Sequence, residues 1–208
     1  MIETSTEFAK LELALCEARG VIRGLPEHNV ENRLHELKLK SYVLLCHAAI
    51  EEYLEGVSLA VLRGSLRAFE ADGTVRDPLL AASSFYKIVL NAEVSSRSAG
   101  DPLQDVLEVV FRRAMDEHRK SVDENHGVKT KDQDALFLPI GVRLFDFDRL
   151  LSQSLNSFGA LRGGFAHGFG IRTITPKAGQ ESKVYNILNL MLAFDNFLCE
   201  RHEVYLNS

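Results

Sequence analysis

The chain has 208 residues, of which 46% are hydrophobic and 25% are charged, with a formal net charge of −5 and a pI near 5.8. This composition matches a globular protein and excludes a disordered chain, which combines low hydrophobicity with high net charge. The acidic balance argues against a surface that attracts nucleic acid everywhere, so any nucleic-acid site must be local.

Cysteine usage and hydropathy indicate the compartment. Cys16, Cys46 and Cys199 stand in helix-like surroundings without the Cys-x-x-Cys spacing of zinc or redox sites. The N-terminal residues are acidic and polar, unlike a secretory signal, and no apolar run reaches the ~18 residues of a membrane-spanning helix. We therefore expect a cytoplasmic protein with buried free thiols and no membrane contact.

The N-terminal part of the chain predicts an accessory helix followed by a long central helix. Thr4 and Glu7 have the spacing of a capping box, and apolar residues recur at helical spacing until Gly-Leu-Pro at residues 24–26. A second helical segment, residues 31–67, is apolar on most sides, as expected of a helix surrounded by others in a bundle. Gly64 is a candidate for its end or for a bend, because glycine costs about 1 kcal/mol relative to alanine inside a helix.

The rest of the chain is also predicted to be mainly helical. Further helices are expected over residues 79–93, 101–120, 130–138, 146–161 and 182–198. His118, Arg119 and Lys120 stand at the C-terminal end of the second of these, where the helix dipole favours cations. Residues 121–134 are polar and predict an exposed connection, whereas the β-branched alternation of residues 171–176 predicts a short extended stretch without a sheet.

Several enzyme classes lack their motifs in this chain. It has no Walker phosphate loop, no Gly-x-Gly-x-x-Gly, no His-Glu-x-x-His and no Gly-x-Ser-x-Gly. Di-iron bundles need Glu-x-x-His pairs, and no glutamate here is followed by histidine at that spacing. His47 and Glu51 lie four apart on the central helix, a spacing that suits two metal ligands or an internal polar pair. We prefer the polar pair and expect no metal or other cofactor.

Residues 162–167, Arg-Gly-Gly-Phe-Ala-His, are the most distinctive chemical feature. Arginine can donate two parallel hydrogen bonds to phosphate oxygens, and histidine changes charge near neutral pH. The two side chains can therefore act on an RNA phosphodiester without metal. One imidazole removes the 2′-hydroxyl proton, the cation stabilises charge on the phosphate, and a second imidazole can protonate the leaving oxygen. Spacing alone fits equally well a glycine-rich helix end with Arg162 and His167 as caps.

Helical geometry complicates this interpretation of the motif. Residues five apart on a straight helix lie about 140° apart around its axis. Arg162 and His167 therefore diverge unless Gly163 and Gly164 bend or end the helix, or let another chain approach closely. A carboxylate in a bundle core also needs a partner, and we expect Glu51 or Glu52 to pair with Arg162.

These residues carry a resemblance to a known superfamily. Residues 161–168, Leu-Arg-Gly-Gly-Phe-Ala-His-Gly, resemble the Arg-x(4–6)-His signature of the HEPN superfamily, many members of which end the motif in Ala-His or Ala-His-Gly. Residues 41–54 resemble the HEPN helix with an acidic-aromatic patch, and residues 125–151 resemble the loop and helix of bacterial groups related to RiboL-PSP and MAE-type nucleases. Active members commonly have Asn, Asp or His after the arginine, where this chain has Gly163.

The resemblance implies a fold and a domain organisation. The expected fold is all-α, an antiparallel helical bundle of HEPN type with additional N-terminal and connecting helices. We expect one domain over residues 1–208, with an accessory helix in residues 1–25 and the bundle in residues 31–206.

The resemblance also implies a function. HEPN proteins form dimers in which two motifs meet, and active members are metal-independent endoribonucleases of toxin–antitoxin or antiviral defence systems. We therefore expect a homodimer that acts on RNA, with an antitoxin or defence-operon protein as a further partner. The alternative is a non-catalytic dimerisation module or an RNA- or protein-binding adaptor. The expected site comprises catalytic Arg162 and His167, supporting Glu51, Glu52, Gly163 and Gly164, and substrate-binding Arg172.

Overall fold

The computed structural model describes residues 4–88, 103–167 and 175–202, and of Ala166 and His167 it describes the backbone alone. All regular structure in these ranges is helical, which confirms the all-α class. None of the described helices combines the length and apolar character that crossing a membrane requires. The described elements are α1 (Thr6–Arg19), η1 (Gly20–Ile22), α2 (Arg33–Asp72), α3 (Asp77–Phe85), α5 (Leu103–Asp123), α6 (Thr130–Phe137), η2 (Leu138–Ile140), α7 (Leu144–Phe147), α8 (Arg149–His167) and α9 (Lys177–Arg201).

Helix α2 is the central helix, as the sequence predicts. It contacts α1, α3, α5, α6, α8 and α9. It begins after Asn32, whose side chain accepts the backbone N–H of His35, and it ends at Gly73, whose φ of 77° favours glycine. The helix does not end at Gly64, so that one of the two expectations for this glycine is wrong. Apolar side chains on both sides of that glycine are buried, and this packing outweighs the cost of one glycine.

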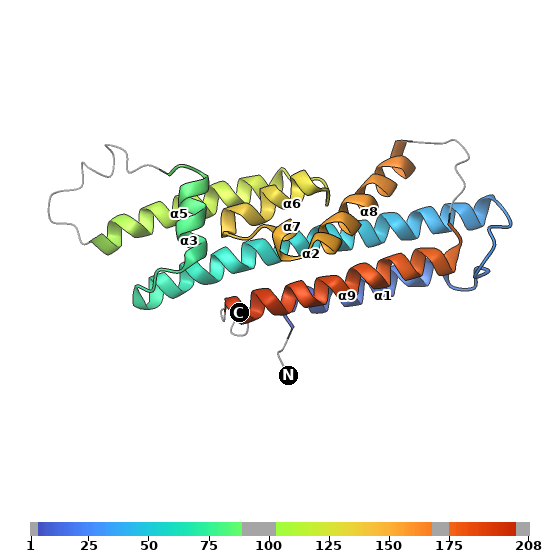
Figure 1. Ribbon diagram of the computed structural model, residues 1–208, viewed down its shortest axis with the longest axis horizontal. Coiled ribbons are helices and arrows are strands. Elements are labelled where there is room, and N and C mark those ends of the chain that lie inside the picture. The colour runs from blue at the N-terminus through green and yellow to red at the C-terminus, as the bar shows by residue number, and fades with distance from the viewer. Residues whose placement is uncertain (1–3, 89–102, 168–174, 203–208) are drawn as a thin grey trace.

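The other helices lie around α2 in two groups (Figure 1). Helices α1 and α9 lie along one side of the bundle and are joined by an ion pair of 2.6 Å between Arg19 Nε and Glu181 Oε1. Helices α3, α5 and α6 lie on the other side of α2. Helices α1, α5 and α8 run antiparallel to α2, whereas α9 runs parallel to it. This arrangement places the C-terminal end of α8 at the surface of the bundle.

A buried carboxylate joins the start of α1 to α9. Ser5, and not Thr4, caps α1, because its Oγ accepts the backbone N–H of Phe8 at 3.0 Å. The same hydroxyl donates to Asp195 Oδ1 at 2.5 Å, and the Ser5 backbone N–H donates to Oδ2 at 2.8 Å. Tyr53 of α2 donates to Oδ1 at 3.0 Å. The partner of Ser5 lies near the other end of the chain, so the capping-box pattern alone does not reveal it.

Several expected element boundaries move for physical reasons. Helix α3 ends at Phe85, because Lys87 has a φ of 51°, which a right-handed helix does not adopt. The centre of the connection between α5 and α6 is not exposed: Val128 is fully buried, and Asn125 donates to Glu55 of α2 at 2.6 Å. Helix α9 begins at Lys177 and not at Ser182. The expected helical residues 89–93 and 101–102 and the extended residues 171–174 lie outside the described ranges.

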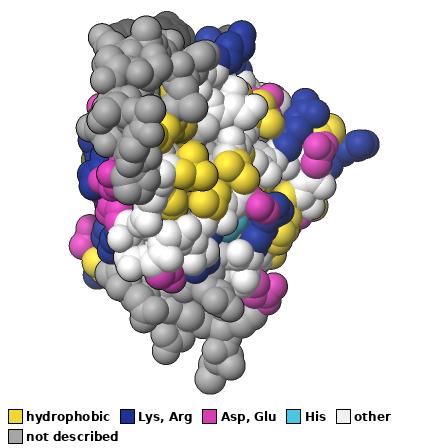
Figure 2. Space-filling view, turned by 90° about the vertical axis from the view of Figure 1, so that its left-hand side faces the viewer, with side chains coloured by type: hydrophobic (Ala, Val, Ile, Leu, Met, Phe, Trp, Pro, Cys, Tyr) yellow, Lys and Arg dark blue, Asp and Glu magenta, His cyan; other side chains and the backbone are white. Residues whose placement is uncertain are grey.

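Figure 2 shows the end of the bundle where α3 lies against the end of α2 and the start of α5. Apolar side chains gather in the middle of this face, and charged side chains of both signs stand around them. The exposed apolar side chains of α3 and of the turn before it are Val75, Leu80 and Phe85. This face lies at the opposite end of the molecule from the C-terminal end of α8.

Candidate functional site

Helix α8 carries the Arg–His motif and is helical throughout it. Asp148 Oδ1 caps the helix by accepting the backbone N–H groups of Leu150 at 2.7 Å and Leu151 at 3.1 Å. The helix does not end at Gly163 or Gly164, and its helical backbone reaches residue 167. Backbone geometry therefore places positions 162 and 167 about 140° apart around one axis. The side chain of His167 lies outside what the structure describes.

Position 163 of the motif is open with respect to the described residues. Arg162 is half-buried, and a Cβ atom built on Gly163 would meet no described atom within 4 Å. By contrast, a Cβ on Gly159, one turn earlier, would meet Lys129 Cγ at 3.1 Å and Val128 Cγ2 at 3.3 Å. A Cβ atom is thus tightly packed at position 159 and unhindered by described atoms at position 163. Arg172 falls outside the described residues.

Helix α2 holds the C-terminal half of α8 through two aromatic contacts. The ring of His47 stacks on Phe158, with centroids 6.2 Å apart and planes at 21°. Lys40 Nζ lies 5.8 Å from the ring centroid of Phe165, which stands inside the motif. The two pairs are seven residues apart on each helix, as expected of antiparallel neighbours. These two contacts fix how α8 is rotated about its own axis and where along α2 the motif lies.

Glu51 and Glu52 do not pair with Arg162 in the described structure. Extending the register of the two aromatic contacts puts Glu51 level with residue 154, about 12 Å along α8 from Arg162. Glu51 Oε2 instead lies 3.4 Å from His47 Nδ1, which supports the preferred polar-pair interpretation of these two residues. Glu52 is exposed, and neither carboxylate forms an ion pair with Arg162. Within the described ranges, no three His, Cys, Asp or Glu side chains are grouped to hold a metal ion.

Lys40 belongs to a charged network that the sequence analysis did not identify. Its Nζ pairs with Glu36 Oε1 at 2.5 Å, and Arg33 Nη1 pairs with the other carboxylate oxygen at 2.7 Å. Two hydrogen bonds, a stronger effect from Lys40 and a weaker one from Arg33, hold the pKa of the Glu36 carboxyl below its usual range. The i,i+4 spacing of Glu36 and Lys40 on the central helix was the available signal. The network orients the lysine that lies over Phe165.

A family comparison bears on this arrangement. The family model described as RiboL-PSP-HEPN matches residues 17–200. The chain belongs to this family. The match runs from within α1 to the last turns of α9, confirms the HEPN interpretation, and indicates a nuclease-type or RNA-related domain. HEPN domains often dimerise and act on RNA. No curated protein and no solved structure gives a significant match.

A second cluster in this HEPN domain corrects an expectation about His118. The sequence suggested a cation at the C-terminal end of its helix, but α5 continues to Asp123 and the imidazole is fully buried. Its Nε2 lies 3.1 Å from Ser58 Oγ and its Nδ1 lies 2.9 Å from the hydroxyl of Tyr86. Burial lowers the pKa of His118 from 6.5 to about 4, so the ring is neutral near pH 7. His118 therefore joins α5 to α2 and to the end of α3.

Proposed function

We propose that the chain is a metal-independent endoribonuclease whose site forms when two copies place Arg162 of one beside His167 of the other. The observation that carries this proposal is the unbroken helical backbone of α8 through the motif. One chain alone directs positions 162 and 167 about 140° apart. A two-fold axis beside α8 would let each arginine meet the histidine of the other copy. Membership of the RiboL-PSP-HEPN family supports RNA as the substrate.

The chemistry follows from the two side chains. The Arg162 guanidinium binds two oxygens of the scissile phosphate and stabilises the charge that develops on them. His167 removes the proton of the neighbouring 2′-hydroxyl, and the 2′-oxygen attacks phosphorus. The bond from phosphorus to the 5′-oxygen breaks, and the imidazolium returns its proton through water to that oxygen. The products are a 2′,3′-cyclic phosphate and a 5′-hydroxyl.

The other site residues act around this pair. Gly163 and Gly164 let the two copies approach closely, consistent with the open space at position 163. Glu51 supports the site through His47, whose ring stacks on Phe158 of α8. We assign Arg172 to binding a flanking phosphate.

Cleavage of single-stranded RNA in the presence of EDTA tests the proposal. We expect products with 2′,3′-cyclic phosphate ends, and a rate that falls about 10²- to 10⁴-fold in Arg162→Ala and in His167→Ala. His28→Ala is a matched control, because this histidine is exposed in the connection between η1 and α2. Cleavage that persists unchanged in His167→Ala would refute the assignment.

A chain that dimerises and binds RNA but cleaves none would be an adaptor module. The glycine directly after Arg162 is compatible with this alternative, because active members commonly have a polar residue there.

We further propose a toxin–antitoxin or antiviral defence role with a neutralising partner protein. In that case expression of the chain should arrest growth, whereas expression of His167→Ala should not.

A further inference from the structure

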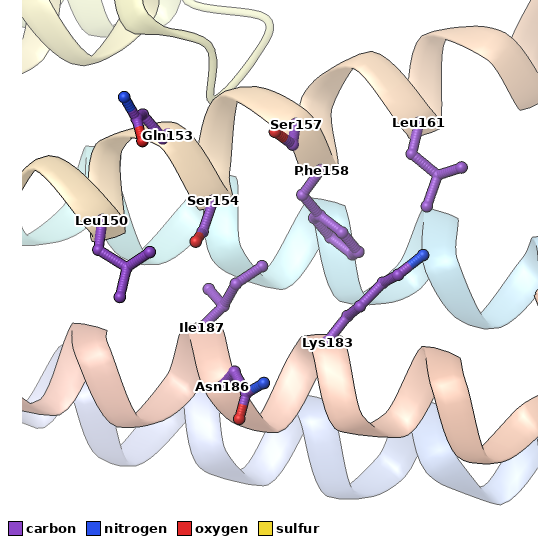
Figure 3. A pocket seen from close by; sticks show the side chains of 9 residues that line it. All are labelled: Leu150, Gln153, Ser154, Ser157, Phe158, Leu161, Lys183, Asn186 and Ile187. Carbon is purple, nitrogen blue, oxygen red and sulfur yellow. The ribbon is translucent and has the colours of Figure 1, made fainter.

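A groove beside the motif runs between α8 and α9. It has a volume of about 520 Å³, which lies within the ~300–1,000 Å³ range of small-ligand sites. One end of the groove is formed by Leu161, the residue that directly precedes Arg162. The residues that line it come from α8 and α9 and are labelled in Figure 3.

The groove has an apolar floor and polar rims. Phe158 points from α8 and Ile187 from α9 into the space between the two helices, and both side chains are buried (Figure 3). Leu150 closes the far end and is 61% exposed. Its polar edges carry Ser154, whose hydroxyl points from α8 toward α9, and the amide of Asn186 on α9, whereas the Gln153 side chain points away from α9 (Figure 3). Apolar surface edged by a hydroxyl and an amide is suited to a flat ring that needs hydrogen bonds at its edge.

The charge around the groove is unusual for this protein. Among the described residues no carboxylate lines it, although the chain contains 29 aspartates and glutamates. Helix α8 itself contains no acidic residue over its 19 residues. Lys183 extends from α9 toward Leu161 (Figure 3), and its Nζ lies 3.4 Å from Thr175 Oγ1. The nearby Glu181 is paired with Arg19 at 2.6 Å. An anion bound in the groove is therefore attracted by Lys183 and repelled by no carboxylate of the described lining.

We propose that this groove binds one or two nucleotides of single-stranded RNA next to the phosphate held by Arg162. The inference rests on the proposed function, which places the scissile phosphate at Arg162. An unstacked base lies on the apolar floor, Ser154 and Asn186 form hydrogen bonds with its edge, and Lys183 neutralises a flanking phosphate. A protein helix is a poorer occupant, because the rims are polar and Leu150 is the one strongly exposed apolar side chain in the lining.

Binding of RNA to a cleavage-deficient chain tests the proposal. The probe is a fluorescently labelled single-stranded RNA of about 12 nucleotides, and the readout is anisotropy with the His167→Ala chain as parent. We expect Lys183→Ala and Asn186→Ala each to weaken binding about tenfold, and Lys183→Arg to bind like the parent. In Lys183→Ala, the slope of the logarithm of the RNA-binding constant against the logarithm of the salt concentration should also fall by about one, because one fewer counterion is released on binding.

Lys120→Ala is the matched control, because this lysine is exposed on α5 and pairs there with Glu117. The proposal is overturned if the groove variants bind like this control, if no form binds RNA, or if Asn186→Ala is monomeric while its parent is dimeric. The last result would assign the groove to a second copy. If the unmutated chain cleaves no RNA but Lys183→Ala still lowers RNA binding, the groove assignment stands and the nuclease proposal falls.

Discussion

At the scale of single residues, Asp195 shows how a buried carboxylate stabilises this fold. It is fully buried and accepts four hydrogen bonds, two from Ser5, one from Tyr53 and a longer one of 3.8 Å from the Cys199 thiol. An amide in its place lacks the negative charge and has one acceptor atom, so at least one of these donors is left unpaired. We expect Asp195→Asn to lower the free energy of unfolding by about 2 kcal/mol, measured by urea denaturation.

Asp116→Asn is the control for this substitution. Asp116 is exposed on α5 and lies 3.4 Å from Arg119, a surface pair of little energetic weight. Equal stabilities of the two variants would show that the Asp195 cluster contributes nothing to folding.

The two glycines of α8 give a second test at this scale. Alanine at 163 finds open space and has the higher helix propensity, so Gly163→Ala should raise the free energy of unfolding by up to about 1 kcal/mol. Gly159→Ala meets Lys129 and Val128 and should gain less or lose stability. Thermal unfolding compares the two variants at low protein concentration. A larger loss in Gly163→Ala than in Gly159→Ala would contradict the open geometry.

Substitution of Gly163 also distinguishes the stability of the single chain from the stability of the dimer. If the two copies approach at this position, Gly163→Ala should weaken the dimer and slow RNA cleavage while the single chain stays folded. Sedimentation and the cleavage assay measure both effects. A variant that dimerises and cleaves RNA like the unmutated chain would remove Gly163 from the interface.

At the scale of elements, the position of α5 depends on a neutral histidine. The pKa of His118 is about 4 in the folded protein and near 6.5 in the unfolded chain, so between these pH values the unfolded state binds more protons. The stabilisation is complete above pH 6.5 and is lost as the pH falls toward 4. From pH 7 to pH 5, His118 alone should lower the free energy of unfolding by about 2 kcal/mol.

His118→Gln checks this prediction, because glutamine is polar but does not titrate. Its free energy of unfolding in urea should fall less between pH 7 and pH 5 than that of the unmutated chain. His202, whose pKa burial also lowers to about 4, is present in both proteins and cancels in the comparison. Identical pH dependence in the two proteins would mean that His118 does not titrate as described.

The elements that follow hydrophobic periodicity could be predicted from the sequence. The buried positions of α2 recur around the helix and identify it as central, whereas α8 continues through the motif, six residues past the end expected at residue 161. The partners of polar residues could not be predicted, because they depend on contacts between distant segments. Asp195 meets Ser5 across 190 positions, and His118 meets Ser58 across 60. The expected pairing of Glu51 or Glu52 with Arg162 fails for the same reason, because it depends on the register between α2 and α8, which puts Glu51 level with residue 154.

At the scale of the whole molecule, the proposed active site depends on assembly. One chain of the RiboL-PSP-HEPN family supplies Arg162 and the backbone of His167 on one continuous helix, and Lys183 is the charged residue in the described lining of the groove between α8 and α9. A two-fold dimer would bring two motifs and two grooves together. An RNA strand that crosses the axis would then meet Arg162 and Lys183 of both copies.

Complementation between two inactive chains tests the composite site most directly. The Arg162→Ala chain and the His167→Ala chain are mixed with each other, unfolded, refolded together and assayed for RNA cleavage in EDTA. The mixed dimer contains one site with both side chains and one site with neither, so about a quarter of the unmutated activity should return. If the mixture stays as inactive as either variant alone while the mixed dimer is shown to form, Arg162 and His167 of different copies do not act together.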